Sequence, residues 1–201
     1  MAKQIRSEHN FLTPVFDEKK ATQAIKLLLE AFGEDLDREG LKSTPSRVAQ
    51  FFKEALAGYS TDPLEFARNH YSTEKHEEIV LLKDISFYSL CEHHLLPFFG
   101  KAHIAYIPKK DKIIGISKLV KLLEIFAARL QLQERLTKQI ADTLVEAVSP
   151  RGVMVIIEAE HLCMTMRGAK KPGSKMATSA VRGIFLKDIR TRLEVMSLLK
   201  N

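Results

Sequence analysis

The chain has 201 residues, of which 45% are hydrophobic, and this content is enough for one globular domain with a sizeable core or for a core domain with a helical extension. It carries 31 Lys and Arg residues against 25 Asp and Glu residues, a formal net charge of +6 that suits a polyanionic ligand without requiring nucleic acid. The first ten residues lack the apolar core of a signal peptide, and no stretch approaches the roughly 20 apolar residues of a membrane span. We therefore expect a cytoplasmic chain.

The first part of the chain, up to about residue 76, has helical patterning. Apolar side chains recur at helical spacing from Ile25 to Phe32 and predict an amphipathic helix that ends near Gly33. A second helix is predicted to be capped by Thr44 and to end at Gly58. The polar stretch 60–78 is the predicted linker, so we expect a helical extension over 1–76 and a second domain over 77–201.

The second domain alternates between strand-like and helix-like segments, which indicates an α+β fold. The segments 77–90 and 101–108 are rich in Val, Ile, Phe and Tyr and are predicted strands, with a turn at 109–112. Ser117 is predicted to cap a helix, and two apolar stripes, which end at Phe126 and Ala147, indicate either one bent helix or two.

The last strand-like segment covers residues 153–168 and follows a turn signal at 149–152. Side chains alternate between the two faces of a strand. An extended strand would therefore bring one set of side chains to the same face: His161, Cys163, Thr165 and Arg167.

Two segments hold residues with metal-ligand chemistry. Cys91 and His94 lie three residues apart in SLCEHHLLPF, and Cys163 can complete the set from the later strand. Two thiolates and an imidazole favour zinc, and three protein ligands with an open position is the catalytic arrangement. With two cysteines in the chain a four-cysteine site is excluded, but His93 or His161 could supply a fourth ligand. A buried thiol beside packed histidines is the alternative without metal.

The remaining histidines of these segments, His93 and His161, would stand near the metal with pKa values suited to proton transfer. Alternatively, each could support a ligand by hydrogen bonding or fill the core. Basic side chains also gather here, since Ser117 and Lys118 open a helix whose amides favour an anion, and Arg167 follows Cys163. The sequence thus predicts a phosphorylated ligand, with solvated charge as the alternative for three loop residues: Lys170, Lys171 and Lys175.

Three long segments closely resemble the signature motifs of the GTP cyclohydrolase I family: SFYSLCEHHLLPFFGKAHIAYIP, GISKLVKLLEIFAARLQLQERL and EAEHLCMTMRG. The likeness runs from about Phe32 to Phe185. It implies a tunnelling fold, which is an antiparallel sheet backed by two helices, here preceded by a helical extension. It also implies that the sheets of five subunits join into a barrel, that two rings form a homodecamer, and that the active sites lie between subunits.

The resemblance implies a hydrolase that converts GTP and water to formate and 7,8-dihydroneopterin triphosphate, the first step of tetrahydrofolate or pterin biosynthesis. Zinc would lower the pKa of bound water for attack on C8 of the purine. The family's zinc ligands match three residues: Cys91, His94 and Cys163. His161 matches the histidine that protonates N7, while His93 and Ser117 match residues that act near the ribose.

The resemblance also assigns substrate contacts. Glu134 matches the carboxylate that accepts hydrogen bonds from the N1 and 2-amino donors of guanine, an arrangement that adenine cannot satisfy. Gln133 lies beside it in the same motif, and Lys118 and Arg167 match triphosphate contacts. Lys121 occupies the position of a further phosphate contact, where the family usually has Arg.

Two other positions depart from the family pattern: some members have Pro where Leu130 stands, and Thr is usual where Met176 stands. Leu130 is expected to continue a helix, and Met176 removes a hydroxyl near the expected phosphate region. None of the departures touches zinc binding or guanine recognition, so we expect them to change the affinity for GTP more than the activity.

Two other functions are compatible with parts of the sequence. A nucleic-acid module with a structural zinc would account for the CxxH spacing and the sequence pI of about 9.3, but it should show a basic surface interleaved with aromatic residues, which we do not find. A related pterin or deazapurine enzyme would share the tunnelling fold. The combined CEHH, HLCM and QERL motifs argue against this second alternative.

Overall fold

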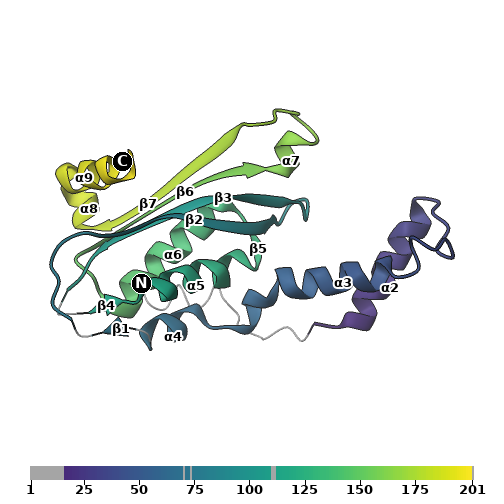
Figure 1. Cartoon of the computed structure of the whole chain (residues 1–201), viewed down its shortest axis with the longest axis horizontal. Helices are drawn as coiled ribbons and strands as arrows, with labels where there is room; N and C mark the ends of the chain where they lie inside the picture. The colour runs from purple at the N-terminus through teal and green to yellow at the C-terminus, as the bar shows by residue number, and fades with distance from the viewer. Residues whose placement is uncertain (1–15, 70, 73, 110–111, 201) are drawn as a thin grey trace. The chain divides into compact units, whose positions relative to one another are not determined.

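The computed structural model describes residues 16–69, 71–72, 74–109 and 112–200, which form two compact units that divide between Ser60 and Thr61 (Figure 1). The predicted turn at 109–112 lies partly outside the described residues. In the described part of the chain, no helix is long and apolar enough to cross a membrane.

Within the described residues 16–60, the first unit contains two α-helices and a short 3₁₀ helix: α2 (Glu18–Ala31), α3 (Thr44–Ala55) and η1 (Ala57–Ser60). The side chain of Asp17 caps α2 by accepting a hydrogen bond of 2.9 Å from the backbone N–H of Lys20. Gly33, with a φ of 79°, follows the end of α2 as predicted. Ser43 rather than Thr44 is the cap residue of α3, and its side chain makes no capping hydrogen bond, while the hydroxyl of Thr44 donates to the carbonyl oxygen of Gly40.

The second unit is built on a five-stranded mixed sheet in the order β5-β2-β3-β6-β7. Its strands are β2 (Val80–Cys91), β3 (Pro97–Ile107), β5 (Leu130–Gln131), β6 (Gly152–His161) and β7 (Lys175–Gly183). The four long strands are antiparallel, while β5 pairs with the end of β2 in parallel. A separate two-stranded sheet joins β1 (Tyr71–Ser72) to β4 (Ile113–Ile114). The predicted α+β class is confirmed.

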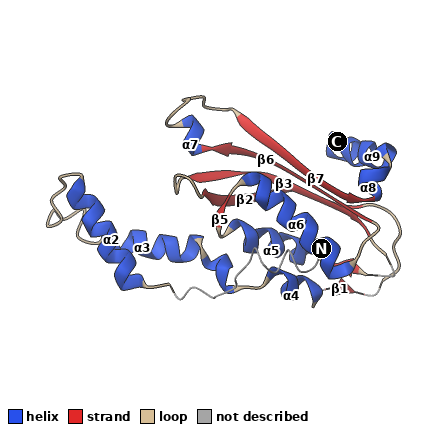
Figure 2. Ribbon diagram, turned by 180° about the vertical axis from the view of Figure 1, so that it is seen from behind, coloured by secondary structure: helices blue, strands red, loops and turns tan. Residues whose placement is uncertain are grey.

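Helices cover both faces of the sheet (Figures 1 and 2). One face carries α4 (Pro63–Arg68), α5 (Ile116–Ala127) and α6 (Gln133–Val148), and the other carries α8 (Ile184–Lys187) and α9 (Ile189–Lys200). The alternation of side chains along β3 divides the core, since Ile104 belongs to the larger core under α5 and α6, whereas Ala105 and Ile107 pack with Phe185 and Val195. The sheet is therefore apolar on both faces at this end.

The structure corrects three predictions about the helical segments and decides a fourth question, which the sequence had left open. The predicted linker contains α4, whose Ala67 is buried and whose Arg68 lies 3.2 Å from Glu146 of α6. The domain boundary after residue 76 stays a proposal. α5 and α6 are two separate helices, and Leu130 lies in the strand between them instead of continuing a helix. Gly115, not Ser117, is the cap residue of α5.

The prediction of one strand over 153–168 is also wrong beyond His161. β6 ends at His161, and residues Leu162–Thr165 form one helical turn, α7. The strand ends there because its neighbours end: Phe98, one residue from the start of β3, pairs with His161, and Lys175 of β7 pairs with Glu160. Without a ladder partner the chain satisfies its backbone groups in a helical turn. Cys163 therefore reaches the site from a helix.

Candidate metal centre and active site

The end of β2 and the turn after it hold the first two candidate metal ligands. Cys91 is the last residue of β2 and only 6% exposed. The backbone N–H groups of His94 and Leu95 both donate to the carbonyl oxygen of Cys91, at 3.3 and 2.8 Å, and this tight turn folds His94 back over the thiol. The Sγ atom of Cys91 and the Nδ1 atom of His94 are consequently 3.9 Å apart.

Cys163 of α7 completes the cluster. One ligand atom from each of Cys91, His94 and Cys163 lies within 4.8 Å of the others, and among the described residues no other histidine, cysteine or carboxylate joins them. Tetrahedral zinc places its sulfur and nitrogen ligands about 3.6–3.8 Å from one another. The three side chains thus fit zinc after a small inward movement, and two thiolates with an imidazole are the donors that zinc prefers.

The electrostatic surroundings of the thiols favour a bound cation. Burial raises the pKa of the Cys163 thiol, and the neighbouring Cys91 raises it further, while Arg167 lowers it. Two thiolates this close would repel each other. A cation between them removes that repulsion, so the cluster is chemically better suited to a metal than to two free thiolates.

His161, the last residue of β6, lies beside this cluster and is held on two sides. Its ring stacks on Phe98 with centroids 4.6 Å apart and an interplanar angle of 1°. Its Nε2 atom is 2.8 Å from Oε1 of Gln133. Burial lowers the pKa of His161, and the carboxylate of Glu134 acts in the opposite direction. The structure therefore places Gln133 and Glu134, two residues that the sequence analysis selected, close to His161, the predicted proton donor.

His93 faces solvent, with a side chain that is 63% exposed. Its ring meets the His94 ring edge-on at 6.1 Å, and its Nε2 atom is 4.0 Å from a carboxylate oxygen of Glu92. Among the described residues, His93 does not belong to the cluster of Cys91, His94 and Cys163. The structure therefore does not support His93 as a fourth ligand. Its position leaves the ring accessible to a bound molecule.

Sequence reasoning missed an ion pair that connects the turn to α6. Arg135 donates to the carboxylate of Glu92 at 2.5 Å, and the backbone N–H of Glu92 donates to the carbonyl oxygen of Gln131 at 3.1 Å. Glu92 is the acid of the CEHH motif and Arg135 belongs to QERL. Both are therefore direct sequence neighbours of residues that the sequence analysis had selected. The pair connects the segment with the metal ligands to the helix with Glu134.

Arg167, a predicted phosphate contact, lies against the metal cluster. Its NH1 atom is 2.8 Å from Nε2 of His94. A guanidinium group only donates, so Nε2 of His94 is the acceptor in this contact. Metal ligation through Nδ1 would leave the proton on Nε2, and the Arg167 contact would then be lost.

The remaining predicted residues, Ser117, Lys118 and Lys121, lie at the start of α5 and away from this cluster. The hydroxyl of Ser89 donates to the carbonyl oxygen of Ala127 at 2.7 Å, which places the end of α5, not its start, beside the end of β2 (Figure 1). A helix of 12 residues spans about 18 Å. Within one chain, these three side chains are therefore not brought to the candidate metal site.

Lys118 and Lys121 have other neighbours in the chain. The Nζ atom of Lys118 lies 5.9 Å from the centroid of the Phe66 ring of α4, and Lys121 forms an ion pair of 3.0 Å with Glu124. Lys118 and Lys121 lie on the same helix, so an anion bound at this end of α5 could contact both side chains.

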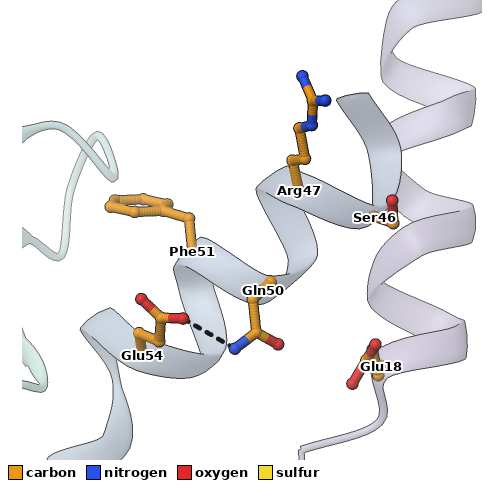
Figure 3. Close-up of a pocket in the computed structure, with 6 residues that line it drawn as sticks. All are labelled: Glu18, Ser46, Arg47, Gln50, Phe51 and Glu54. Atoms are coloured by element: carbon orange, nitrogen blue, oxygen red, sulfur yellow. Dashed lines mark hydrogen bonds between the residues drawn. The ribbon is translucent and has the colours of Figure 1, made fainter. Parts of the chain in front are cut away.

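The first unit has a surface hollow of about 470 Å³, shown in Figure 3. Six residues of α2 and α3 line it: Glu18, Ser46, Arg47, Gln50, Phe51 and Glu54. Gln50 donates to Glu54 at 2.8 Å across this surface. None of the residues that the sequence analysis selected lines the hollow.

Comparison with known proteins gives consistent matches over most of the chain. The profile of the GTP cyclohydrolase I family matches residues 21–200. The GTP cyclohydrolase 1 of Carboxydothermus hydrogenoformans is 61% identical over 183 residues, which cover 91% of this chain and 95% of that protein. The protein of the same name from Pelotomaculum thermopropionicum is 58% identical over 186 residues, covering 92% and 98% of the two chains. The chain thus belongs to the GTP cyclohydrolase I family.

Proposed function

We propose that this chain catalyses the reaction of its family: the imidazole ring of GTP is opened by hydrolysis, formate leaves, and the ribose part rearranges and closes to 7,8-dihydroneopterin triphosphate. The observation that carries the proposal is the cluster of Cys91, His94 and Cys163 beside His161 and Glu134, in a chain that matches the family over residues 21–200. The first part is geometry and the second is sequence identity.

The metal of this proposal is zinc, held by the three clustered side chains. Two sulfur donors and one nitrogen donor leave one tetrahedral position for water. When bound, zinc supplies Lewis-acid activation of that water near neutral pH. The short turn from Cys91 to Leu95 is what orients two of the three ligands.

His161 is the proposed proton donor to N7 of the purine. Stacking on Phe98 and the hydrogen bond to Gln133 fix the plane of its ring. Burial lowers the pKa of His161 and so favours the neutral ring, whereas the nearby Glu134 favours the protonated form. These opposing effects suit a group that must both take up and release a proton. His93, which is exposed beside Glu92, is proposed to serve proton transfers at the ribose.

Glu134 is the proposed guanine-binding residue. It is exposed in the first turn of α6 and is near enough to His161 to raise the pKa of that ring. A free carboxylate can accept two hydrogen bonds from the N1 and 2-amino groups of guanine. Adenine offers no such pair of donors, so the same carboxylate would remain unpaired with ATP.

The triphosphate and ribose contacts are proposed to come from a second copy of the chain. Ser117, Lys118 and Lys121 carry the expected chemistry but lie at the far end of α5 from the metal cluster. Among the described residues, no strand pairs with the outer edge of β7 or with that of β2 before residue 90, so these edges can receive a neighbouring sheet. A tunnelling-fold barrel of five subunits, paired into a decamer, would use these edges and complete the site with Arg167 from one subunit and Lys118 from the next.

The test is formate release from GTP by the purified protein, with ATP as the control substrate. Removal of zinc with a chelator should abolish formate release, and added zinc should restore it. Cys163→Ala should lose both bound zinc and formate release, whereas Met166→Ala, an exposed change three residues later, should keep both. Undiminished formate release by the metal-free protein would overturn the proposal.

A further inference from the structure

Gln133, the first residue of α6, is buried to a degree that is unusual for a polar side chain. It is 1% exposed, and each end of its amide has partners inside the protein. The family likeness suggests a direct substrate contact, but an amide whose donors and acceptor are already used has little capacity left for a ligand. Its neighbours indicate a different role.

The partners of the amide nitrogen determine which way the amide faces. Nε2 of Gln133 donates to the backbone carbonyl oxygens of Ile157 and Met176, at 3.0 and 2.9 Å. Carbonyl oxygens only accept, so the amide oxygen cannot occupy that position. Oε1 of Gln133 must therefore face Nε2 of His161, which lies 2.8 Å away.

Two threonines reinforce this orientation. The hydroxyl of Thr137 donates to the carbonyl oxygen of Gln133 at 2.7 Å, so Thr178 must be the donor in the contact of 2.6 Å between the two hydroxyls. The oxygen of Thr178 is then free to accept from Nε2 of Gln133, at 3.1 Å. The hydrogen bonds close into a ring that would be broken if the amide were reversed.

We propose that Gln133 is a positioning residue that holds His161 with its proton on Nε2, so that Nδ1 is the nitrogen that exchanges a proton with the substrate. An amide oxygen accepts, so Nε2 of His161 must carry hydrogen in this contact. Stacking on Phe98 opposes rotation of the ring, and no described residue forms a hydrogen bond with Nδ1. The proposal rests on the proposed function, in which His161 is the proton donor.

The proton path follows from this assignment. In the neutral ring Nδ1 holds a lone pair, takes up a proton from solvent water to form the imidazolium ion, and gives that proton to N7. The ring then returns to the form with hydrogen on Nε2, and Oε1 of Gln133 accepts from Nε2 throughout. Gln133 would therefore affect the chemical step without touching GTP.

The experiment measures the ring nitrogens of His161 directly. The chain, with its seven histidines, is labelled with ¹⁵N-histidine, and the zinc-loaded protein is studied by solid-state NMR at pH 8. The His161→Gln variant identifies the resonances. In the wild-type protein we expect a protonated Nε2 and an unprotonated Nδ1. A proton on Nδ1 would overturn the proposal whatever the variants do.

Two matched variants test the consequence. Gln133→Met removes the acceptor and should shift His161 toward a mixture of tautomers and lower kcat by about tenfold or more, with KM for GTP and zinc content within about twofold. Gln131→Met removes an equally buried amide that donates to Phe126 and Gln139 instead, and should leave the tautomer of His161 and kcat unchanged.

The outcomes separate this proposal from the proposed function. A rise in KM at constant kcat in Gln133→Met would mean a direct substrate contact, and an unchanged tautomer in that variant would mean that Gln133 does not position the ring. If the wild-type protein releases no formate from GTP, the proposed function fails, while the NMR result still decides which nitrogen of His161 carries the proton.

Discussion

At the residue scale, single side chains are exposed or buried in ways that separate recognition from support. Glu134 and Gln133 are neighbours in sequence, yet one is exposed and the other is buried. Consecutive positions at the start of a helix point about 100° apart, so one can face a ligand while the other enters the core. A test of Glu134 therefore probes its proposed contact with guanine, and a test of Gln133 probes its proposed support of His161.

Replacing Glu134 by Gln should lower kcat/KM for GTP by about 10-fold to 100-fold, because a charged hydrogen-bond acceptor contributes about 1.5–3 kcal/mol. Steady-state kinetics with GTP measure this loss. Glu194→Gln, an equal change at an exposed position of α9, serves as the control and should have no effect. Equal kinetics in the Glu134 variant and the wild type would remove Glu134 from guanine recognition.

A second prediction at this scale concerns His103 of β3, whose Nδ1 atom accepts a hydrogen bond of 3.1 Å from the backbone N–H of Asp84. This contact requires an unprotonated Nδ1. Burial lowers the pKa of His103 from its ordinary 6.5. The surrounding charges act in both directions, with two acids raising the pKa and two bases lowering it: Asp84 and Glu158, and Lys83 and Lys101.

The unfolded chain therefore binds a proton at His103 more readily than the folded protein does. The stability from this group is complete above about pH 6.5 and is lost as the pH falls through the lower pKa of the folded state. Urea unfolding at pH 7.5 and pH 5 should show a larger loss for the wild type than for His103→Asn, which keeps an acceptor but cannot titrate. The same pH dependence in both proteins would contradict the prediction.

At the element scale, the positions of the candidate metal ligands depend on how two segments end. Cys91 is the last residue of β2 and His94 lies in the turn after it, while α7 carries Cys163 because β6 loses its ladder partners after His161. The sequence alternation across HLCMTM is typical of a strand and was misleading here. The pattern of residues within one strand does not indicate where the neighbouring strands begin, and here those neighbours determined where β6 ends.

The ion pair between Glu92 and Arg135 connects this turn to α6. Arg135→Met should weaken zinc binding by about fivefold, since a partly exposed pair contributes about 1 kcal/mol and the turn would be held less firmly. Competition with a zinc chelator measures the affinity. Lys138→Met, three residues later on the same helix and exposed, is the control and should bind zinc as the wild type does.

At the scale of the whole molecule, the separation of the α5 residues from the metal cluster leads to a complementation test. Cys163→Ala and Lys118→Ala should each be nearly inactive alone. Co-expressed at equal amounts they should recover part of the activity, because roughly a quarter of the interfaces in a random ring combine an intact cluster with an intact Lys118. A site contained within one chain would give no recovery, and this result would contradict the shared site.

The sequence by itself determined the chemistry that this protein carries. It identified the α+β class, two thiols and a histidine at spacings that suit zinc, and the motifs that the family comparison then matched over residues 21–200. These conclusions were available because they depend on residue type and on short spacings along the chain.

Only the tertiary structure decided how those residues meet. The segment around Cys163 forms a helical turn, and the amide oxygen of Gln133 faces His161. Ser117 lies at the far end of α5 from the candidate metal cluster. Each of these depends on contacts between segments distant in sequence, which strand pairing and core packing determine. The spacing of residues along the sequence does not indicate which distant segments come into contact.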